Sequence, residues 1–289
     1  MSLSLSGPPR MSTWTESPLP TVTTPTAVGR YRIVRTLGEG LMGGVHLAVR
    51  DRQYWVLRLL HDTRVRRLPL ATQLHGNALD PHLVSYRETG LDPEVGAFIA
   101  SDPVDGTALD TKLREPHQVV ELLRPLLEAV QRLHTHGGVH GTIKPSNVLV
   151  RRSSGTAILV DAGLAYAATP TQRPLLLAHA YPHLAPEVIE AYETGSSERI
   201  ITSLGIAADI YSAGLLVAET LVGRRLFPAG RDARELIARK RTSSVVVYGI
   251  DEGRTAPLAQ AIRAATASDP ARRPRVLADL IHGLSLLAR

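Results

Sequence analysis

Cysteine is absent from all 289 residues of the chain. Its absence excludes a disulfide framework, a thiol nucleophile and a thiolate metal site. Aromatic residues are also scarce, at 4% of the chain, so the mixture of basic and stacking side chains that binds nucleic acid is missing. We therefore expect no nucleic-acid partner.

Long apolar runs are missing as well. No stretch approaches the ~18 to 20 apolar residues needed to cross a bilayer. The N-terminus also lacks the charged and then apolar regions of a signal peptide. We therefore expect a cytoplasmic protein with no membrane span. Residues 1–28 are rich in Ser, Thr and Pro, a composition too polar to pack, and are predicted to form a disordered arm.

Lysine is rare, occurring only at positions 112, 144 and 240, so the net charge of +6 comes almost wholly from arginine. The basic residues are scattered in short clusters, which we interpret as solvated surface; an anionic partner is the alternative. The hydrophobic content of 44% is enough to bury a sizeable core.

A glycine-rich loop follows the first predicted strand, which covers residues 31–37. Residues 38–45 read GEGLMGGV, a G-x-G-x-x-G-x-V pattern. Such glycines let backbone N–H groups approach phosphates closely, because no Cβ intervenes, although a plain hairpin turn would look the same. A strand at 45–49 follows rather than a helix, which argues against a dinucleotide-binding fold.

A polar, turn-rich run at 140–150, HGTIKPSNVLV, lies between a helical segment and an apolar strand. It is followed at 160–163 by the short turn VDAG. In this order and spacing, the glycine loop, the polar run and the turn resemble the protein kinase superfamily, of the bacterial Ser/Thr type. The resemblance covers residues 30–289. It implies an α+β fold with two lobes, a small β-rich one at 29–103 and a large helical one at 104–289.

The resemblance also implies a site for ATP and Mg²⁺, with binding that is weak or absent in this chain. Asn147 and Asp161 match the family's two metal-binding positions, and Lys144 matches the residue that neutralises the transferring phosphate. The positions that would surround the nucleotide are Gly38, Gly40, Gly43, Val45, Val56, Arg58, Val104 and Leu149. The hinge between the lobes resembles residues 101–106, where Asp102 and Val104 would offer backbone groups to an adenine.

Several positions depart from the kinase pattern. Thr142 stands where the family has its catalytic Asp, and a threonine hydroxyl is a poor base. Losing a general base typically costs ~10² to 10⁴ in rate. The Thr that usually bonds this Asp aligns with Ala180, and the Arg that senses a phosphorylated activation loop aligns with Gly141.

The usual phosphate-gripping Lys aligns with Arg58 on a strand predicted at 53–60. Arg is a planar fork and Lys a compact charge, so this exchange is not conservative. We leave open whether Arg58 seeks the surface or makes a weak phosphate contact. No Glu occurs between residues 61 and 79, where a short helix should carry the partner of that Lys, so the family's switchable ion pair is predicted to be absent.

Ala162 stands where the family packs a Phe into an apolar column that links the lobes. An unfilled Phe-to-Ala cavity costs about 3 to 5 kcal/mol. Either a neighbouring side chain fills this space or the column is broken.

The structural positions of the family are kept. A helix is predicted at 117–136, a buried helix at 208–217 whose Asp209 holds the catalytic-loop backbone, and a buried pair between Arg273 and Glu187. Two more strands are predicted at 83–87 and 97–100, and a surface loop at 188–207. The remaining candidates for metal binding are interpreted as structural histidines: His134, His136 and His140.

We therefore predict a pseudokinase that serves as a scaffold or regulatory binding module for another signalling protein, and that ATP could switch. One alternative is a slow but active Ser/Thr protein kinase. Another is a purely structural domain with an empty cleft, suggested by Val56, which is bulkier than the Ala usual above the adenine.

Overall fold

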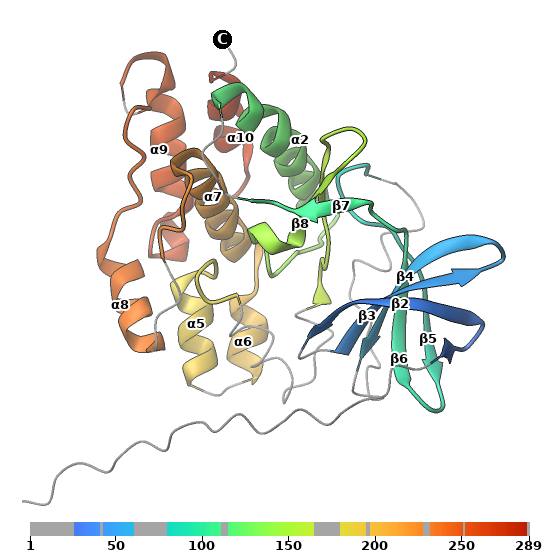
Figure 1. The fold of residues 1–289 in the computed structure, drawn as a ribbon. Coiled ribbons are helices and arrows are strands. Elements are labelled where there is room, and N and C mark those ends of the chain that lie inside the picture. The colour runs from blue at the N-terminus through green and yellow to red at the C-terminus, as the bar shows by residue number, and fades with distance from the viewer. Residues whose placement is uncertain are drawn as a thin grey trace, which may run out of the picture.

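The computed structural model describes residues 26–40, 43–60, 80–110, 115–164, 180–194, 197–227, 232–250 and 252–287. These residues form a small β-rich lobe and a larger helical lobe that lie side by side (Figure 1). The predicted α+β, two-lobed fold is confirmed. The predicted arm at 1–28 falls almost wholly outside the described residues, as does the predicted helix at 61–79.

The small lobe is a six-stranded antiparallel sheet with strand order β1-β2-β3-β4-β6-β5. The glycine-rich loop joins its second and third strands. The strands are β1 (Ala27–Val28), β2 (Tyr31–Gly40), β3 (Gly43–Arg50), β4 (Gln53–Leu60), β5 (Tyr86–Asp92) and β6 (Gly96–Ser101).

A tight turn sets the register of β3 and β4. Asp51 and Arg52 both have positive φ, 52° and 62°, as a two-residue hairpin turn that matches the strand twist requires. The resulting register places Arg58 of β4 opposite Val45 of β3 on one side and opposite Ile99 of β6 on the other. Arg58 is thus fixed in the middle of the sheet, next to the strand that leaves the glycine loop.

The strand predicted at 83–87 begins instead at Tyr86. Leu83 forms a bridge with Leu159, and the Val84 N–H donates to the Leu159 carbonyl at 3.0 Å. Residues 83 and 84 therefore pair with the helical lobe rather than with β6. The apolar pattern alone could not distinguish these two partners.

The helical lobe contains a small three-stranded sheet and a set of helices. The sheet has the order β7-β8-β9, with β7 at Gly106–Ala108, β8 at Val148–Arg151 and β9 at Ala157–Leu159. The helices are α2 (Pro116–Thr135), α5 (Pro186–Glu193), α6 (Ser197–Ser203), α7 (Ile206–Val222), α8 (Ala233–Thr242), α9 (Ala256–Ala265) and α10 (Ala278–Ser285), with 3-10 turns η1 (Pro145–Asn147), η2 (Gly253–Thr255) and η3 (Pro270–Arg272).

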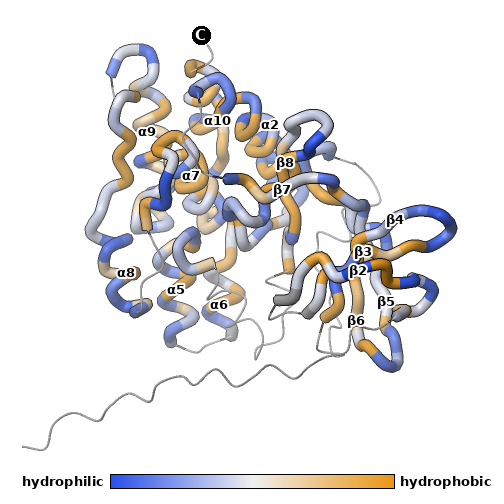
Figure 2. The backbone as a smooth tube through the Cα atoms, in the orientation of Figure 1, coloured by the Kyte–Doolittle hydropathy of each residue, from blue (hydrophilic) through white to orange (hydrophobic). Residues whose placement is uncertain are grey.

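Helix α7 is the centre of the helical lobe. Residues 208–220 of α7 are all buried, as the prediction of a central buried helix required. Its neighbours approach closely, since a Cβ added at Gly214 would lie 2.7 Å from the Cβ of Ala265 on α9. By contrast, α8 at the edge of the lobe is mostly hydrophilic (Figure 2). The charged residues of α7 are therefore in the core, where each needs a partner.

The surface loop predicted at 188–207 is wrong. Helices α5 and α6 occupy most of this range. Val188, Ile189 and Ile200 are buried in the main core, and burying one face of each helix gives the segment its stability. The polar residues at 194–197 mark only the junction of the two helices.

The described part of the chain contains no helix that combines the length and the apolar character required to span a membrane.

Candidate functional site

A cavity of about 340 Å³ lies between the sheet and the helical lobe. This is within the range of small-ligand sites, about 300 to 1,000 Å³. Seven of the predicted site residues line it. They are Gly38, Val45, Val56, Arg58, Val104, Leu149 and Asp161.

The walls of this cleft are largely apolar. Val45 and Val56 come from the sheet and Leu149 comes from β8, so a flat ring could be held between the lobes. Val104 lies in the connection between the lobes, and its N–H makes no hydrogen bond within the described residues. Gly38 leaves open space, with no atom within 4 Å of an added Cβ. Val56 therefore narrows the cleft without closing it.

The backbones of Gly40 and Gly43 pair with each other at the end of the β2–β3 hairpin. Gly38, from the same glycine-rich pattern, lines the cavity.

Arg58 and Asp161 form an ion pair inside the cleft. The Arg58 Nη2 donates to Asp161 Oδ1 at 2.6 Å, and the two side chains are 22% and 23% exposed. Arg58 therefore points inward, and the surface-seeking alternative is wrong. The sequence did not predict this pair, because the partners are 103 positions apart.

Asp161 is presented by a strained turn. Its φ is 68°, in the left-handed region that non-glycine residues seldom adopt. The turn is closed by Gly163, whose N–H donates to the His140 carbonyl at 2.9 Å. The turn is thereby fastened to the polar loop, and the carboxylate is held toward the cleft.

The polar loop is anchored to the central helix by Asp209. Its carboxylate accepts hydrogen bonds from the backbone N–H of His140 at 2.7 Å and of Gly141 at 2.8 Å. The same carboxylate accepts from Nε2 of His134 at 2.9 Å. The predicted role of Asp209 is confirmed, and these three bonds satisfy an otherwise costly buried charge.

His140 is fully buried and holds the loop from within. Its Nδ1 accepts from the Thr142 N–H at 3.2 Å, so the proton is on Nε2, which donates to the Val160 carbonyl at 3.0 Å. Burial lowers the pKa of His140 below its usual value, against the opposing effect of Asp209. The ring is therefore neutral and structural. His134 is likewise structural, because it bonds Asp209, whereas His136 bonds the backbone of its own helix.

Thr142 is buried at 3% exposure, and its hydroxyl is occupied. Nδ2 of Asn147 donates to the Thr142 carbonyl at 2.9 Å and to its Oγ1 at 3.2 Å. The amide oxygen of Asn147 has no hydrogen bond from any described residue, so it is the atom available for a cation. Thr142 offers no carboxylate and no free base.

Lys144 lies near the Asp161 carboxylate. Burial lowers its pKa, and the nearby charge of Asp161 opposes that shift while Arg58 adds to it. The end of the cleft next to Asp161 thus has two cationic side chains, Arg58 and Lys144, around the Asp161 carboxylate. Its electrostatic potential favours an anion.

The activation segment is described only from residue 180 onward. Ala180 is fully buried, and its carbonyl accepts from the N–H groups of His183 at 2.8 Å and Leu184 at 3.1 Å. An alanine has no hydroxyl to reach Thr142 or Lys144. In kinases a Thr of this segment bonds the catalytic Asp. Here Ala180 and Thr142 stand at these two positions, so neither partner of that contact is present.

The comparisons with known proteins agree with this geometry. A protein kinase domain family model matches residues 31–283. The chain belongs to the protein kinase family. Serine/threonine-protein kinase PknD of Mycobacterium tuberculosis is 29% identical over 271 residues, which cover 87% of this chain and 39% of PknD. A probable serine/threonine-protein kinase of Bifidobacterium longum, pknA2, is 29% identical over 283 residues, covering 90% of this chain and 35% of that protein.

Solved structures show the same fold. The kinase domain of Mycobacterium tuberculosis PknI has a TM-score of 0.65 at 20% sequence identity, over 91% of this chain and 98% of that one. The chain spans well under half the length of the two curated kinases above.

The position of the Phe of the kinase metal turn is buried in this chain. Ala162 is 5% exposed and belongs to a buried cluster with Tyr86, Leu60 and Leu164. The Tyr86 hydroxyl donates to the Ala162 carbonyl at 3.4 Å. Among the described residues, Tyr86 is therefore the candidate to fill the space that the Phe takes in kinases.

The predicted kinase pair between Arg273 and Glu187 is confirmed. Two parallel bonds join them, Nη1 to Oε1 at 2.6 Å and Nη2 to Oε2 at 2.8 Å. The remaining donors of Arg273 bond the carbonyls of Ala207, Ala267 and Ser268. Every nitrogen of this guanidinium is used, as a buried cation requires.

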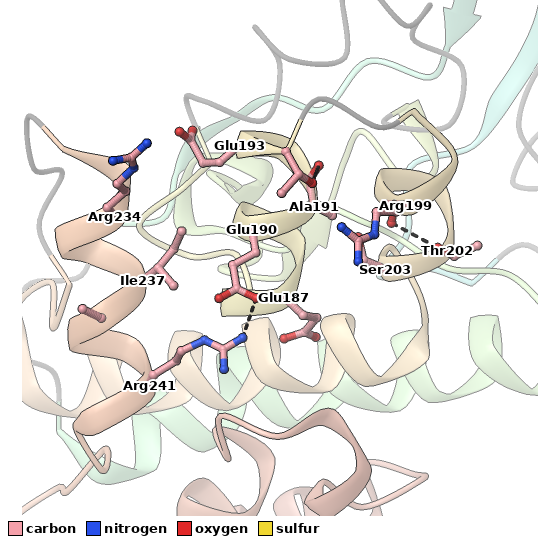
Figure 3. A pocket seen from close by; sticks show the side chains of 12 residues that line it. Glu187, Glu190, Ala191, Glu193, Arg199, Thr202, Ser203, Arg234, Ile237 and Arg241 are labelled. Atoms are coloured by element: carbon pink, nitrogen blue, oxygen red, sulfur yellow. Dashed lines mark hydrogen bonds and ion pairs between the residues drawn. The ribbon is translucent and has the colours of Figure 1, made fainter.

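A second hollow of about 740 Å³ lies among α5, α6 and α8 (Figure 3). Two of its three acidic side chains form ion pairs within the protein. Glu190 pairs with Arg241, and Glu187 pairs with Arg273. Figure 3 shows Arg241 reaching toward Glu190 across the hollow. We interpret this hollow as a structural groove.

Sequence reasoning missed six residues that line the cleft. They are Leu37, Val84, Tyr86, Ile99, Ser146 and Val160. Tyr86 is a large residue that lies close in the fold to Ala162, which is small for its position. The sequence alone does not show this proximity, because the two residues are 76 positions apart.

Proposed function

We propose that this chain is a pseudokinase, a kinase-fold module that binds and regulates another signalling protein without transferring phosphate. The observation that carries the proposal is the state of Thr142. It occupies the position of the base, has no carboxylate and is buried with its hydroxyl bonded to Asn147.

The contrast between structural and chemical residues supports this proposal. Asp209 and the Arg273–Glu187 pair, which hold the fold together, keep their full sets of bonds. The positions that perform chemistry have changed at Thr142, Ala180 and Arg58. Function depends on the site rather than on the fold. Because the fold is kept while catalytic positions are changed, we favour a binding role over catalysis.

The open cleft supports a nucleotide as the switch of this module. A cavity of about 340 Å³ with apolar walls and a cationic end fits a nucleoside phosphate better than an empty relic. This favours the switched scaffold over a purely structural domain. We place the protein in the cytoplasm with a signalling partner.

The second candidate is a slow Ser/Thr protein kinase, as the names of the relatives suggest. It is favoured by Lys144, Asn147 and Asp161, which keep the residue types of a working kinase. Phosphoryl transfer depends mainly on positioning and electrostatic stabilisation, so loss of the base need not abolish it.

A phosphotransfer assay separates the two candidates. The purified chain is incubated with Mg²⁺ and γ-labelled ATP, with itself and with generic basic proteins as acceptors. We expect no label above that of the Asp161→Ala variant. Robust labelling that Asp161→Ala abolishes would overturn the proposal in favour of an active kinase.

A further inference from the structure

The Arg58–Asp161 pair changes the character of the cleft. A kinase metal site binds Mg²⁺ through one or two carboxylates together with substrate phosphates, so a cation that already pairs with the carboxylate competes with the metal. Here Oδ1 of Asp161 already accepts from the Arg58 guanidinium at 2.6 Å. Asp161 is also the only carboxylate among the described residues at this end of the cavity; the other one in its lining, Asp102, lies at the hinge and binds Arg87.

The surrounding charge also disfavours a divalent cation. Arg58 and Lys144 both act electrostatically on this end of the cleft, and only Asp161 opposes them. A Mg²⁺ ion would therefore approach two cations and a carboxylate that already pairs with one of them. Asn147 could still offer its amide oxygen, but a neutral ligand does not offset this repulsion. The residues present do not fit the metal.

The same arrangement suits a polyanion. A guanidinium has five N–H donors in a planar fork that matches phosphate geometry. The contact with Asp161 uses one nitrogen of Arg58, and the side chain lines the open cavity at 22% exposure. The register holds it opposite Val45, at the exit of the glycine-rich hairpin. Arg58 can thus turn its remaining donors to phosphate oxygens without leaving its strand.

We propose that the cleft binds a nucleoside polyphosphate without a divalent metal ion, with the Arg58 guanidinium as the resident cation in the place of the metal. Asp161 then acts as a competitor of the phosphates for Arg58, not as a metal ligand. This inference rests on the proposed function, because it describes the nucleotide switch of the same module.

The experiment is a calorimetric titration of the full chain with ATP, once in EDTA and once in excess Mg²⁺. We expect binding in EDTA that Mg²⁺ does not strengthen. Arg58→Gln should weaken binding in EDTA about 10- to 100-fold, because the charged hydrogen bonds to phosphate are lost. The matched control is Arg124→Gln, at an exposed ion pair on α2, and should bind as the wild type does.

The decisive variant is Asp161→Asn. If Asp161 competes with phosphate for Arg58, removing its charge should tighten binding in EDTA by up to about fivefold. If Asp161 holds a metal, the same substitution should weaken binding in Mg²⁺. The control Asp279→Asn makes the same change of charge at an exposed position of α10. Thermal unfolding of each variant establishes that it is folded.

The outcomes separate this inference from the proposed function. Binding that requires Mg²⁺, or that Asp161→Asn weakens, overturns the metal-free site and leaves the pseudokinase proposal standing. No binding in either buffer overturns this inference together with the nucleotide switch, and leaves a pseudokinase that regulates its partner without a nucleotide. Phosphate transfer in the same Mg²⁺ samples overturns the proposed function, whatever the metal dependence of binding.

Discussion

The packing of Tyr86 beside Ala162 predicts a strong energetic coupling between the two positions. In this chain a large residue on β5 and a small residue in the metal turn share one buried cluster. Ala162→Phe restores the usual kinase residue but introduces it where Tyr86 already lies. Tyr86→Leu removes the ring and leaves space. The double variant should therefore be more stable than the sum of the two single changes predicts.

The magnitudes follow from the burial of both residues, 7% exposed for Tyr86 and 5% for Ala162. Forcing a ring into a packed core costs typically about 1 to 3 kcal/mol. Removing most of a buried aromatic side chain costs up to about 3 to 5 kcal/mol, and less for Leu, which keeps part of the volume. Because the added ring enters the space vacated by the other, we expect a favourable coupling energy of at least about 1 kcal/mol.

Urea unfolding of the four proteins in this cycle measures the coupling. Midpoints give the free energies, and unchanged m-values show that the folded and unfolded states are comparable. The control cycle combines Tyr86→Leu with Ala191→Phe on α5, a buried alanine in a different cluster, and should be additive within about 0.5 kcal/mol. Additivity of the Tyr86 and Ala162 changes would refute the claim that Tyr86 fills the missing Phe.

Two further predictions concern buried charges of the helical lobe. Arg273→Met leaves Glu187 without its partner and should lower the free energy of unfolding by about 3 to 5 kcal/mol, measured by urea denaturation; a loss below about 1 kcal/mol would contradict the structural role of the pair. His183 has its pKa lowered to about 3, by burial and then by the positive charges of Arg225 and Lys240, so below its unfolded pKa near 6.5 only the unfolded chain binds this proton. Stability should therefore fall as the pH drops from 6.5 toward 3, by up to about 1.4 kcal/mol per pH unit relative to His183→Asn, and parallel pH profiles of the two proteins would refute this.

The carboxylate that faces His183 does not alter the sign of that effect. Glu219 Oε2 lies 3.3 Å from His183 Nδ1, and burial raises the pKa of Glu219 to about 7. Glu219 is therefore largely protonated below pH 7 and offers little negative charge to a protonated His183. Its own raised pKa adds stability as the pH falls from 7 to 4.5, in both the wild type and the variant, so the comparison isolates the histidine.

Local patterns in the sequence predicted several elements of the fold, and the resemblance to the kinase family predicted its two lobes. The strand expected at residues 53–60 is β4 with the same bounds, and the helix expected at 117–136 is α2 to within one residue at either end. Asp209 was identified because residues 208–217 resemble the central helix of the kinase family, and the structure supplies the expected backbone partners. The strand and the helix depend on residues that are close in sequence, whereas the role of Asp209 came from the family motif.

The errors arose at segments whose structure depends on contacts with residues that are distant in the sequence. The strand at β5 begins later than expected because Leu83 and Val84 pair with Leu159 of the other lobe. The direction of Arg58 was undetermined because its partner, Asp161, is brought near only by the closing of the two lobes. A polar junction at 194–197 obscured the apolar faces of α5 and α6. The sequence alone does not show which of these distant segments lie close together in the fold.

The measurement that tests the central claim most directly is the intact mass of the purified protein after prolonged incubation with Mg²⁺ and ATP. It counts every covalently bound phosphate, whichever residue accepts it, with Asp161→Ala treated in parallel. We expect each protein to keep its own unmodified mass, because Thr142 supplies no base and Arg58 pairs with the carboxylate that would hold the metal. Addition of phosphate to the wild type but not to Asp161→Ala would contradict it and show a working kinase.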